Sequence, residues 1–294
     1  MTDTDILWLG QQACGQRLLV GAKSANLSKI CSRYTIPPGF SVPSSFFKKF
    51  DTYPMDKDKI AAELSNSVSE AYIALGKKCE CVDPSVAIRS SAIDEDNKQA
   101  SFAGQFKTFL NISGIDTVIP LIIDCYQSAF SDQVLAYRKD KGIDVNYAMS
   151  VFIQHFIHAD MSSVVFSKNP MNDDTSEIII NANWGLGESI VSGNVTPDTY
   201  IIDKNSLTIK QKMIAKKLMM TITNPGNGIQ DVEIPKIMAD TPVMTDEQII
   251  ENARFAQQLE TDFNMYVDIE CAWKNEKLYL LQCRPVTTSI CKKG

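Results

Sequence analysis

Hydrophobic residues recur at the spacing of an α-helix in several stretches of the chain. In residues 57–78, for example, Ile60, Leu64 and Leu75 fall on one face of a helix with 3.6 residues per turn. The same criterion, together with turn signals at the ends of each stretch, predicts helices over residues 21–30, 44–50, 57–78, 116–139 and 245–259.

Other stretches alternate as strands do. Phe106, Thr108, Leu110 and Ile112 share one face of residues 106–112. Strands are predicted over residues 85–89, 106–112, 148–157, 162–167, 177–182, 199–202, 207–210, 265–273 and 278–284. Helices and mostly antiparallel strand pairs in mixed order predict an α+β protein with two lobes. Residues 212–240 have weak periodicity and are predicted to form an irregular or mobile insertion.

The length, net charge and hydropathy of the chain argue against several classes of protein. At 294 residues, the chain is long enough for about two domains. It carries 29 Lys and Arg against 35 Asp and Glu, a net charge of −6, which argues against a dedicated nucleic-acid binder. No apolar run approaches the ~20 residues of a membrane span, and the acidic start lacks the features of a signal peptide. We therefore expect a cytoplasmic protein with reduced cysteines and no membrane partner.

The final predicted hairpin carries the most informative polar residues. Asp268 and Glu270 share a face of one strand, and Gln282 and Arg284 share a face of the next. An even register would place Glu270 opposite Gln282 and Asp268 opposite Arg284, whereas an odd register is equally compatible with the turn. Carboxylate and amide oxygens suit Mg²⁺, and an arginine suits phosphate. A salt-bridged solvent face is the alternative.

Three further segments carry candidate phosphate ligands. Ser101, Gly104 and Thr108 lie in a segment of small and hydroxyl residues, Arg89 ends an apolar strand, and Lys23 lies at a helix start. A surface loop, a structural ion pair and a solvated lysine are the respective alternatives.

Two nucleotide-binding fingerprints are absent from the sequence. It contains no G-x-x-x-x-G-K-[ST] motif, and the glycines of residues 185–188 do not match G-x-G-x-x-G. Gln154 and His155 end a predicted strand, where a polar pair suits either a base edge or a satisfied sheet edge.

Nine segments together resemble one family. In order they are VGAKSANLSKI, IPPGFSVP, VAIRSSAIDED, SFAGQFKTFLNI, VFIQHFI, SSVVFSKNP, NWGLGESIVSGNVTPDTY, DIECAW and LQCRPVT. They resemble the ATP-binding domain of phosphoenolpyruvate synthase, pyruvate phosphate dikinase and rifampin phosphotransferase. The resemblance implies a two-lobed α+β ATP-grasp fold with the nucleotide between the lobes. It implies an N-terminal lobe of residues 1–150 with phosphate-contacting loops. The C-terminal lobe, residues 151–294, would carry the adenine linker and a metal-binding hairpin.

The resemblance also implies roles for individual residues. Lys23 and Arg89 match phosphate ligands, and Ser101, Gly104 and Thr108 match the loop that covers the phosphates. The sequence departs from the family pattern at two positions. It has Ala22 where the family usually has glycine and Cys271 where the family often has tryptophan, and neither change alters these assignments.

The second half of the chain matches the family's remaining ligand positions. The linker that holds adenine is matched by Gln154, His155, Phe156 and Ile157. Glu188 matches a turn residue near the ribose or phosphates. Glu270 and Gln282 match Mg²⁺ ligands, and Arg284 matches the arginine that stabilises the transferred phosphoryl group.

The implied function is an ATP-dependent phosphotransferase, resembling the nucleotide-binding half of a dikinase and using ATP and Mg²⁺. Arg284, Arg89 and Lys23 would be its catalytic cations. The acceptor would be a small molecule or a histidine on a separate phosphohistidine-type partner, because no segment of this sequence resembles the family's phosphohistidine motif. An ATP-grasp ligase that activates a carboxylate and a non-catalytic nucleotide-binding module are the alternatives.

Overall fold

The computed structural model describes residues 5–50, 56–93, 106–140, 142 and 148–286. The chain divides into two compact units. Unit 1 comprises Met1–Phe156 and Thr223–Ile229, and unit 2 comprises Ile157–Ile222 and Gln230–Gly294.

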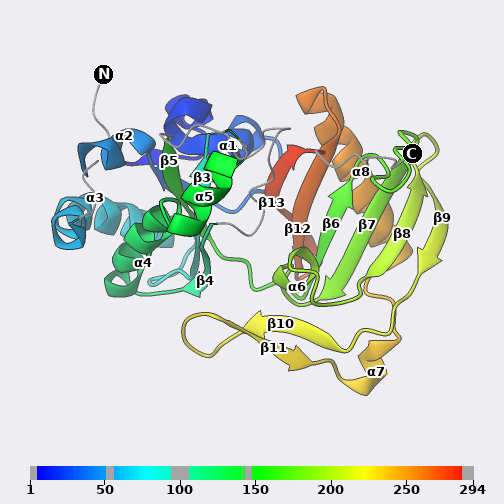
Figure 1. The fold of residues 1–294 in the computed structure, drawn as a ribbon. Helices are drawn as coiled ribbons and strands as arrows, with labels where there is room; N and C mark the ends of the chain where they lie inside the picture. The colour runs from blue at the N-terminus through cyan, green and yellow to red at the C-terminus, as the bar shows by residue number, and fades with distance from the viewer. Residues whose placement is uncertain (1–4, 51–55, 94–105, 141, 143–147, 287–294) are drawn as a thin grey trace. The chain divides into compact units, whose positions relative to one another are not determined.

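Unit 1 is built on a five-stranded sheet in the order β1-β2-β5-β3-β4. Each neighbouring pair in this sheet is antiparallel. Its strands are β1 (Leu7–Trp8), β2 (Gly39–Val42), β3 (Val86–Ala92), β4 (Thr108–Ile112) and β5 (Met149–His155). Its helices are α1 (Arg17–Ile30), α2 (Ser44–Phe47), α3 (Lys57–Lys78), α4 (Ile115–Ser128) and α5 (Asp132–Asp140), with 3₁₀ turns at Ala13–Gly15 and Lys48–Phe50. The apolar faces of α3 and α4 and one face of the sheet enclose the core (Figure 1).

The single helix predicted over residues 116–139 is two helices, α4 and α5. Between them, the Phe130 ring packs against Tyr126, with ring centroids 5.1 Å apart. Helix α5 begins at Asp132, directly after Ser131, and serine and aspartate both favour helix starts. The hydrophobic period continues across this break, which explains why the pattern predicted one helix.

Unit 2 is built on a six-stranded sheet in the order β13-β12-β6-β7-β8-β9, which is antiparallel throughout. Its strands are β6 (Met161–Phe166), β7 (Glu177–Trp184), β8 (Asp198–Asp203), β9 (Thr208–Met213), β12 (Val267–Lys274) and β13 (Lys277–Pro285). The short helix α6 spans Glu188–Val191, and the long helix α8 spans Asp246–Phe263. Thr245 and Gln248 form a capping box that fixes the start of α8, which lies against the sheet (Figure 1).

Residues 212–240 are not an irregular insertion, contrary to the prediction. They include β10 (Met219–Thr223), β11 (Ile229–Glu233) and α7 (Lys236–Ala239), and β10 pairs with β11. Lys217 in this segment is fully buried and forms an ion pair with Asp198. Both strands are short and half-exposed, so the residues do not alternate long enough to give a strand pattern.

Asn111, at the end of β4 in unit 1, holds the loop at residues 224–228. Its side-chain Nδ2 lies 3.3, 3.2 and 2.8 Å from the carbonyl oxygens of Asn224, Gly226 and Gly228, so its two N–H groups are shared among three acceptors. The Gly228 N–H in turn donates to the Asn111 carbonyl at 2.9 Å. Asn111 adopts a left-handed backbone with φ of 56°, a conformation that asparagine tolerates better than most residues.

The predicted α+β class with mostly antiparallel sheets is confirmed, and it is consistent with an ATP-grasp-like fold. In the part of the chain that the structure describes, no helix combines the length and apolar character needed to cross a bilayer.

Candidate functional site

The hairpin of β12 and β13 brings four polar side chains onto one face. Glu270 lies directly opposite Gln282, and Asp268 lies opposite Arg284. Residues opposite each other in an antiparallel pair point to the same side of the sheet. The even register considered from the sequence is therefore the one that forms.

A β-bulge produces this register. A two-residue turn, Asn275–Glu276, places Lys274 opposite Lys277. Continued without interruption, that pairing would set Glu270 against Leu281. Instead, the register shifts between Glu270 and Cys271, so Leu281 is the extra residue on β13. Bulges re-aim side chains in this way, and they are frequent beside functional sites.

Helix α8 covers the opposite face of the hairpin strands. Ser163 on β6 lies opposite Cys271 of β12, and its hydroxyl donates to the Asn252 side chain of α8 at 2.9 Å. Cys271 and Ile269 therefore point toward α8, and both are buried. The alternate residues, Asp268 and Glu270, point away from α8.

Asp268 orients the Arg284 guanidinium. Arg284 Nε donates to Asp268 Oδ2 at 2.9 Å. The Asp268 side chain is 9% exposed and that of Arg284 is 35% exposed. The guanidinium is thus fixed by a nearly buried carboxylate and still reaches solvent, which suits recognition of an anion. The candidate list from the sequence did not include Asp268, although alternation with Glu270 had placed it opposite Arg284.

In unit 1, the sheet brings Arg89 and Thr108 together. They are direct partners in the β3–β4 pair, and Thr108 is exposed at the start of β4. Lys23 from α1 donates through Nζ to the carbonyl oxygen of Ser90, the residue after Arg89, at 3.1 Å. Three of the predicted phosphate-contacting residues therefore gather at one place on β3. Ser101 and Gly104 lie outside the described residues.

Lys23 owes its place to a break in α1 at Gly21. Gly21 has φ of 70° and ψ of −179°, so the helix is interrupted there. A Cβ atom at Gly21 would lie 2.0 Å from the Ser91 carbonyl oxygen, so only glycine allows α1 to approach β3 this closely.

The four residues of the predicted adenine linker fall at the end of β5 and just beyond it. Gln154 is 1% exposed, and its side-chain amide donates to the Pro37 carbonyl at 3.2 Å. His155 and Phe156 bond through their backbone N–H groups to unit 1, whereas Ile157 is the first residue of unit 2. The Gln154 side chain is thus hydrogen-bonded to a backbone carbonyl within unit 1, on a strand that is paired on both sides.

Glu188 is the first residue of α6 and is exposed. The turn before it is fixed by Gly185, whose φ is 73° and whose Cβ, if present, would lie 2.4 Å from the Thr221 carbonyl oxygen. The Ser162 hydroxyl donates to the Gly185 carbonyl at 2.8 Å. The exposed carboxylate therefore follows a rigidly held turn.

Comparison with known proteins identifies the family. The family model described as "Pyruvate phosphate dikinase, AMP/ATP-binding domain" matches residues 52–294. The chain belongs to this family. A probable phosphoenolpyruvate synthase of Methanocaldococcus jannaschii is 33% identical over 98% of the chain. Two other relatives are the phosphoenolpyruvate synthase of Pyrococcus furiosus, 40% identical over 77% of the chain, and the uncharacterized phosphotransferase YvkC of Bacillus subtilis, 35% identical over 95%. The chain spans 27%, 29% and 35% of the lengths of these three relatives, respectively.

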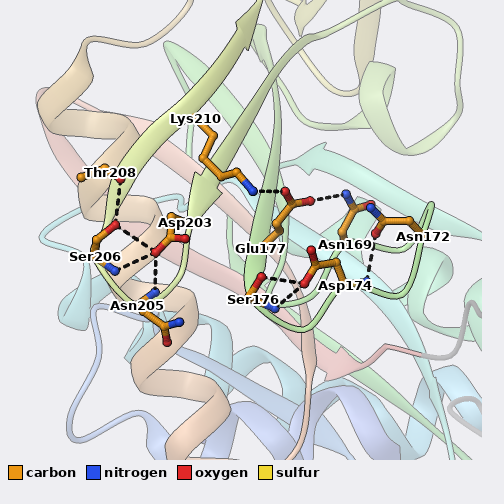
Figure 2. Close-up of polar contacts among 10 residues, drawn as sticks. All are labelled: Asn169, Asn172, Asp174, Ser176, Glu177, Asp203, Asn205, Ser206, Thr208 and Lys210. Atoms are coloured by element: carbon orange, nitrogen blue, oxygen red, sulfur yellow. Dashed lines mark hydrogen bonds and ion pairs between the residues drawn. The ribbon is translucent and has the colours of Figure 1, made fainter.

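A second polar cluster of this dikinase-family chain lies on the loops between β6 and β7 and between β8 and β9 (Figure 2). Asp174 accepts the N–H and hydroxyl of Ser176, which lowers its pKa. Asp203 likewise accepts the N–H and hydroxyl of Ser206, and its pKa is also lowered. These are turn-capping bonds.

Glu177 completes the cluster in Figure 2. Its carboxylate accepts from Lys210 at 2.5 Å and from Asn169 at 2.7 Å. The Lys210 bond and then the Asn169 bond lower the pKa of Glu177. Among the described residues, no group of three or more His, Cys, Asp or Glu side chains is arranged to hold a metal ion. We interpret this cluster as structural.

Proposed function

We propose that the chain is an ATP-dependent phosphotransferase module that binds MgATP and passes a phosphoryl group to an acceptor. Lys23, Arg89 and Thr108 would contact phosphates, and Arg284 would be the cation that stabilises the transferred group. The observation that carries the proposal is the register of the β12–β13 hairpin, which sets Glu270 against Gln282 and Asp268 against Arg284.

The hairpin has the donor set for a magnesium ion. Glu270 offers carboxylate oxygens and Gln282 an amide oxygen from directly opposed positions on one face. Mg²⁺ prefers hard oxygen ligands and takes few from protein, with phosphate and water completing its octahedron. The pair therefore fits, and the two residues would hold the ion. When bound, Mg²⁺ would neutralise charge on the phosphate oxygens.

The remaining chemistry rests on fixed positive charge. Phosphoryl transfer depends on positioning and on charge stabilisation, so it requires no nucleophilic side chain on the chain itself. Asp268 orders Arg284 before the nucleotide arrives, so little conformational freedom is lost in the reaction. Lys23 and Arg89 would hold the phosphates from strand and helix positions instead of from mobile loops.

The relatives' names suggest the kind of acceptor. Several are called phosphoenolpyruvate synthases and one a phosphotransferase, and all of those named above are about three times the length of this chain or more. We propose a small-molecule acceptor or a histidine on a partner domain. In a dikinase-type reaction, ATP, water and the acceptor give AMP, free phosphate and the phosphorylated acceptor, so water takes up the phosphate that the acceptor does not.

The test compares two glutamates of the same hairpin. Glu270→Gln replaces the charged carboxylate ligand of the magnesium ion with a neutral amide, whereas Glu276→Gln makes the same change at an exposed turn residue. Each protein is titrated with ATP in the presence of Mg²⁺, and phosphorus NMR follows the nucleotide in a crude metabolite and protein extract. Loss of a group that only supports a metal ligand costs about 10- to 100-fold. We expect Glu270→Gln to cost at least about 100-fold in turnover and Glu276→Gln to leave it unchanged.

The products discriminate among the alternatives. AMP with free phosphate supports transfer of the dikinase type. ADP would indicate a simple kinase or a carboxylate-activating ligase. ATP binding without any product above the Glu270→Gln background would indicate a nucleotide-binding module. No ATP binding by the unaltered protein would refute the proposal.

A further inference from the structure

Four buried serine side chains meet where α1 breaks at Gly21. They are Ser24 of α1, Ser41 of β2, Ser91 of β3 and Ser150 of β5, here called the serine cluster, and each is 0% exposed. A buried hydroxyl destabilises the folded state unless it is hydrogen-bonded. The partners of these hydroxyls therefore show what the cluster does.

The cluster satisfies backbone groups at the helix break. Ser150 Oγ lies 2.5 Å from the Val20 carbonyl oxygen and 3.1 Å from that of Ser91. A hydroxyl carries one proton, so the shorter contact to Val20 is the stronger bond. Val20 is the residue immediately before Gly21, where α1 is interrupted.

The other hydroxyls hold the start of the helix beyond the break. Ser91 Oγ accepts from the Ser24 backbone N–H at 3.4 Å, and the Ser41 hydroxyl donates to Ser24 Oγ at 2.9 Å. Ser91 and Ser150 are direct partners in the β3–β5 pair. The neighbouring strands β3 and β5 therefore hydrogen-bond to α1 on both sides of Gly21, at Ser24 and at Val20.

Lys23 lies between Val20 and Ser24, the two residues of α1 that these strands hold. It follows Gly21 by two residues and precedes Ser24, and its Nζ bonds the Ser90 carbonyl at 3.1 Å. Ser90 separates Arg89 from the cluster member Ser91. Any shift of the break relative to β3 would therefore move the Lys23 ammonium relative to Arg89.

We propose that Ser150 is a positioning residue that acts through Lys23, fixing the ammonium for contact with the phosphates of ATP. The inference rests on the proposed function, in which Lys23 contacts those phosphates. Removing the Ser150 hydroxyl leaves the buried Val20 carbonyl without its closest donor. The break at Gly21 then relaxes, and Lys23 loses its fixed place above β3.

The test is a double-mutant cycle on ATP affinity. Ser150→Ala, Lys23→Ala and the double variant are titrated with ATP in the presence of Mg²⁺ and, separately, with adenosine, which lacks phosphates. Ser163→Ala is the matched control, because Ser163 is 1% exposed and donates one side-chain bond to Asn252 in unit 2. Loss of one buried hydrogen bond predicts about a five- to tenfold weaker ATP affinity for Ser150→Ala.

Three results together support the proposal. Ser150→Ala weakens ATP binding but leaves adenosine binding within about twofold. The same change has no further effect in the Lys23→Ala background, as expected of residues that act through one another. Ser163→Ala lowers the melting temperature comparably without changing ATP affinity.

Other results would overturn it. An unchanged ATP dissociation constant in Ser150→Ala, an equal loss for ATP and adenosine, or full additivity with Lys23→Ala would each exclude a positioning role. If Ser150→Ala does not fold, Ser41→Ala replaces it in the cycle with the same criteria. Failure of the proposed function is distinct: the unaltered protein would then not bind ATP, or Lys23→Ala would bind it normally, and the inference would fall with it.

Discussion

The buried ion pair between Lys217 and Asp198 allows a quantitative test of the fold of unit 2. Both side chains are 0% exposed, and Lys217 Nζ lies 2.6 Å from Asp198 Oδ1. The aspartate also accepts from the backbone N–H groups of Ala215 and Val243, at 2.9 and 2.8 Å. Lys217→Met keeps most of the side-chain volume and removes the charge.

The expected decrease in the free energy of unfolding of Lys217→Met follows from the burial of the ion pair. Breaking a buried pair leaves an uncompensated charge and costs about 3–5 kcal/mol. A whole domain is stable by only about 5–15 kcal/mol, so the loss is a large part of the total. Lys212→Met is the matched control, because Lys212 pairs with Asp246 through side chains that are 39% and 61% exposed. An exposed pair of this kind contributes about 0–1 kcal/mol.

Urea unfolding followed by tryptophan fluorescence measures both variants. With a slope of about 2 kcal/mol per M, typical of urea, the loss lowers the Lys217→Met midpoint by about 1.5–2.5 M. The Lys212→Met midpoint should move by less than about 0.5 M. A Lys217→Met loss below about 1 kcal/mol would refute the reasoning, because the pair would then be no more important than one at the surface.

Two further predictions concern backbone geometry and pH. Gly21→Ala should cost about 2–4 kcal/mol in thermal unfolding, because its Cβ would lie 2.0 Å from the Ser91 carbonyl oxygen at φ of +70°. Gly193→Ala, with φ of +71° and nothing within 4 Å, should cost only about 1 kcal/mol, and equal losses would contradict the close approach. The hydrogen bond from Lys210 is the main reason that the pKa of Glu177 in the folded protein is lower than its ordinary value of 4.5. The ionised Glu177 therefore stabilises the folded state above pH 4.5, and this stabilisation is lost as the pH falls through the lowered pKa. The gap in unfolding free energy between the unaltered protein and Glu177→Gln should therefore narrow from pH 7 to pH 4, and a constant gap would exclude this linkage.

The sequence predicted the polar face of the hairpin but not its register. Alternation alone places Asp268 with Glu270 and Gln282 with Arg284, since side chains in a strand have a period of two. The pairing that the two-residue turn starts would set Glu270 opposite Leu281. The extra residue Leu281 on β13 shifts the register by one, so that Glu270 lies opposite Gln282. A bulge of this kind depends on packing on both sides of the sheet, so a single strand pattern carries no signal for it.

For the candidate phosphate residues too, the sequence identified the residues, and the fold decided which of them lie together. Resemblance to the family singled out Lys23, Arg89 and Thr108 individually. The β3–β4 pairing then made Arg89 and Thr108 direct neighbours, and the break at Gly21 brought Lys23 to Ser90. Contacts between residues distant in the sequence depend on which strands pair, and local periodicity does not encode strand order.

By itself, the sequence determined the α+β class, most of the segments that form strands and helices, and the family. Local preference and periodicity suffice for the class and the elements, because they depend on neighbouring residues, whereas the family follows from the resemblance of the nine ordered segments. Only the tertiary structure decided the register of the β12–β13 hairpin, the burial of Lys217 and the serine cluster next to Lys23. Each of these depends on hydroxyl, carbonyl or charged groups that must find partners once water is excluded, and those partners come from distant parts of the chain.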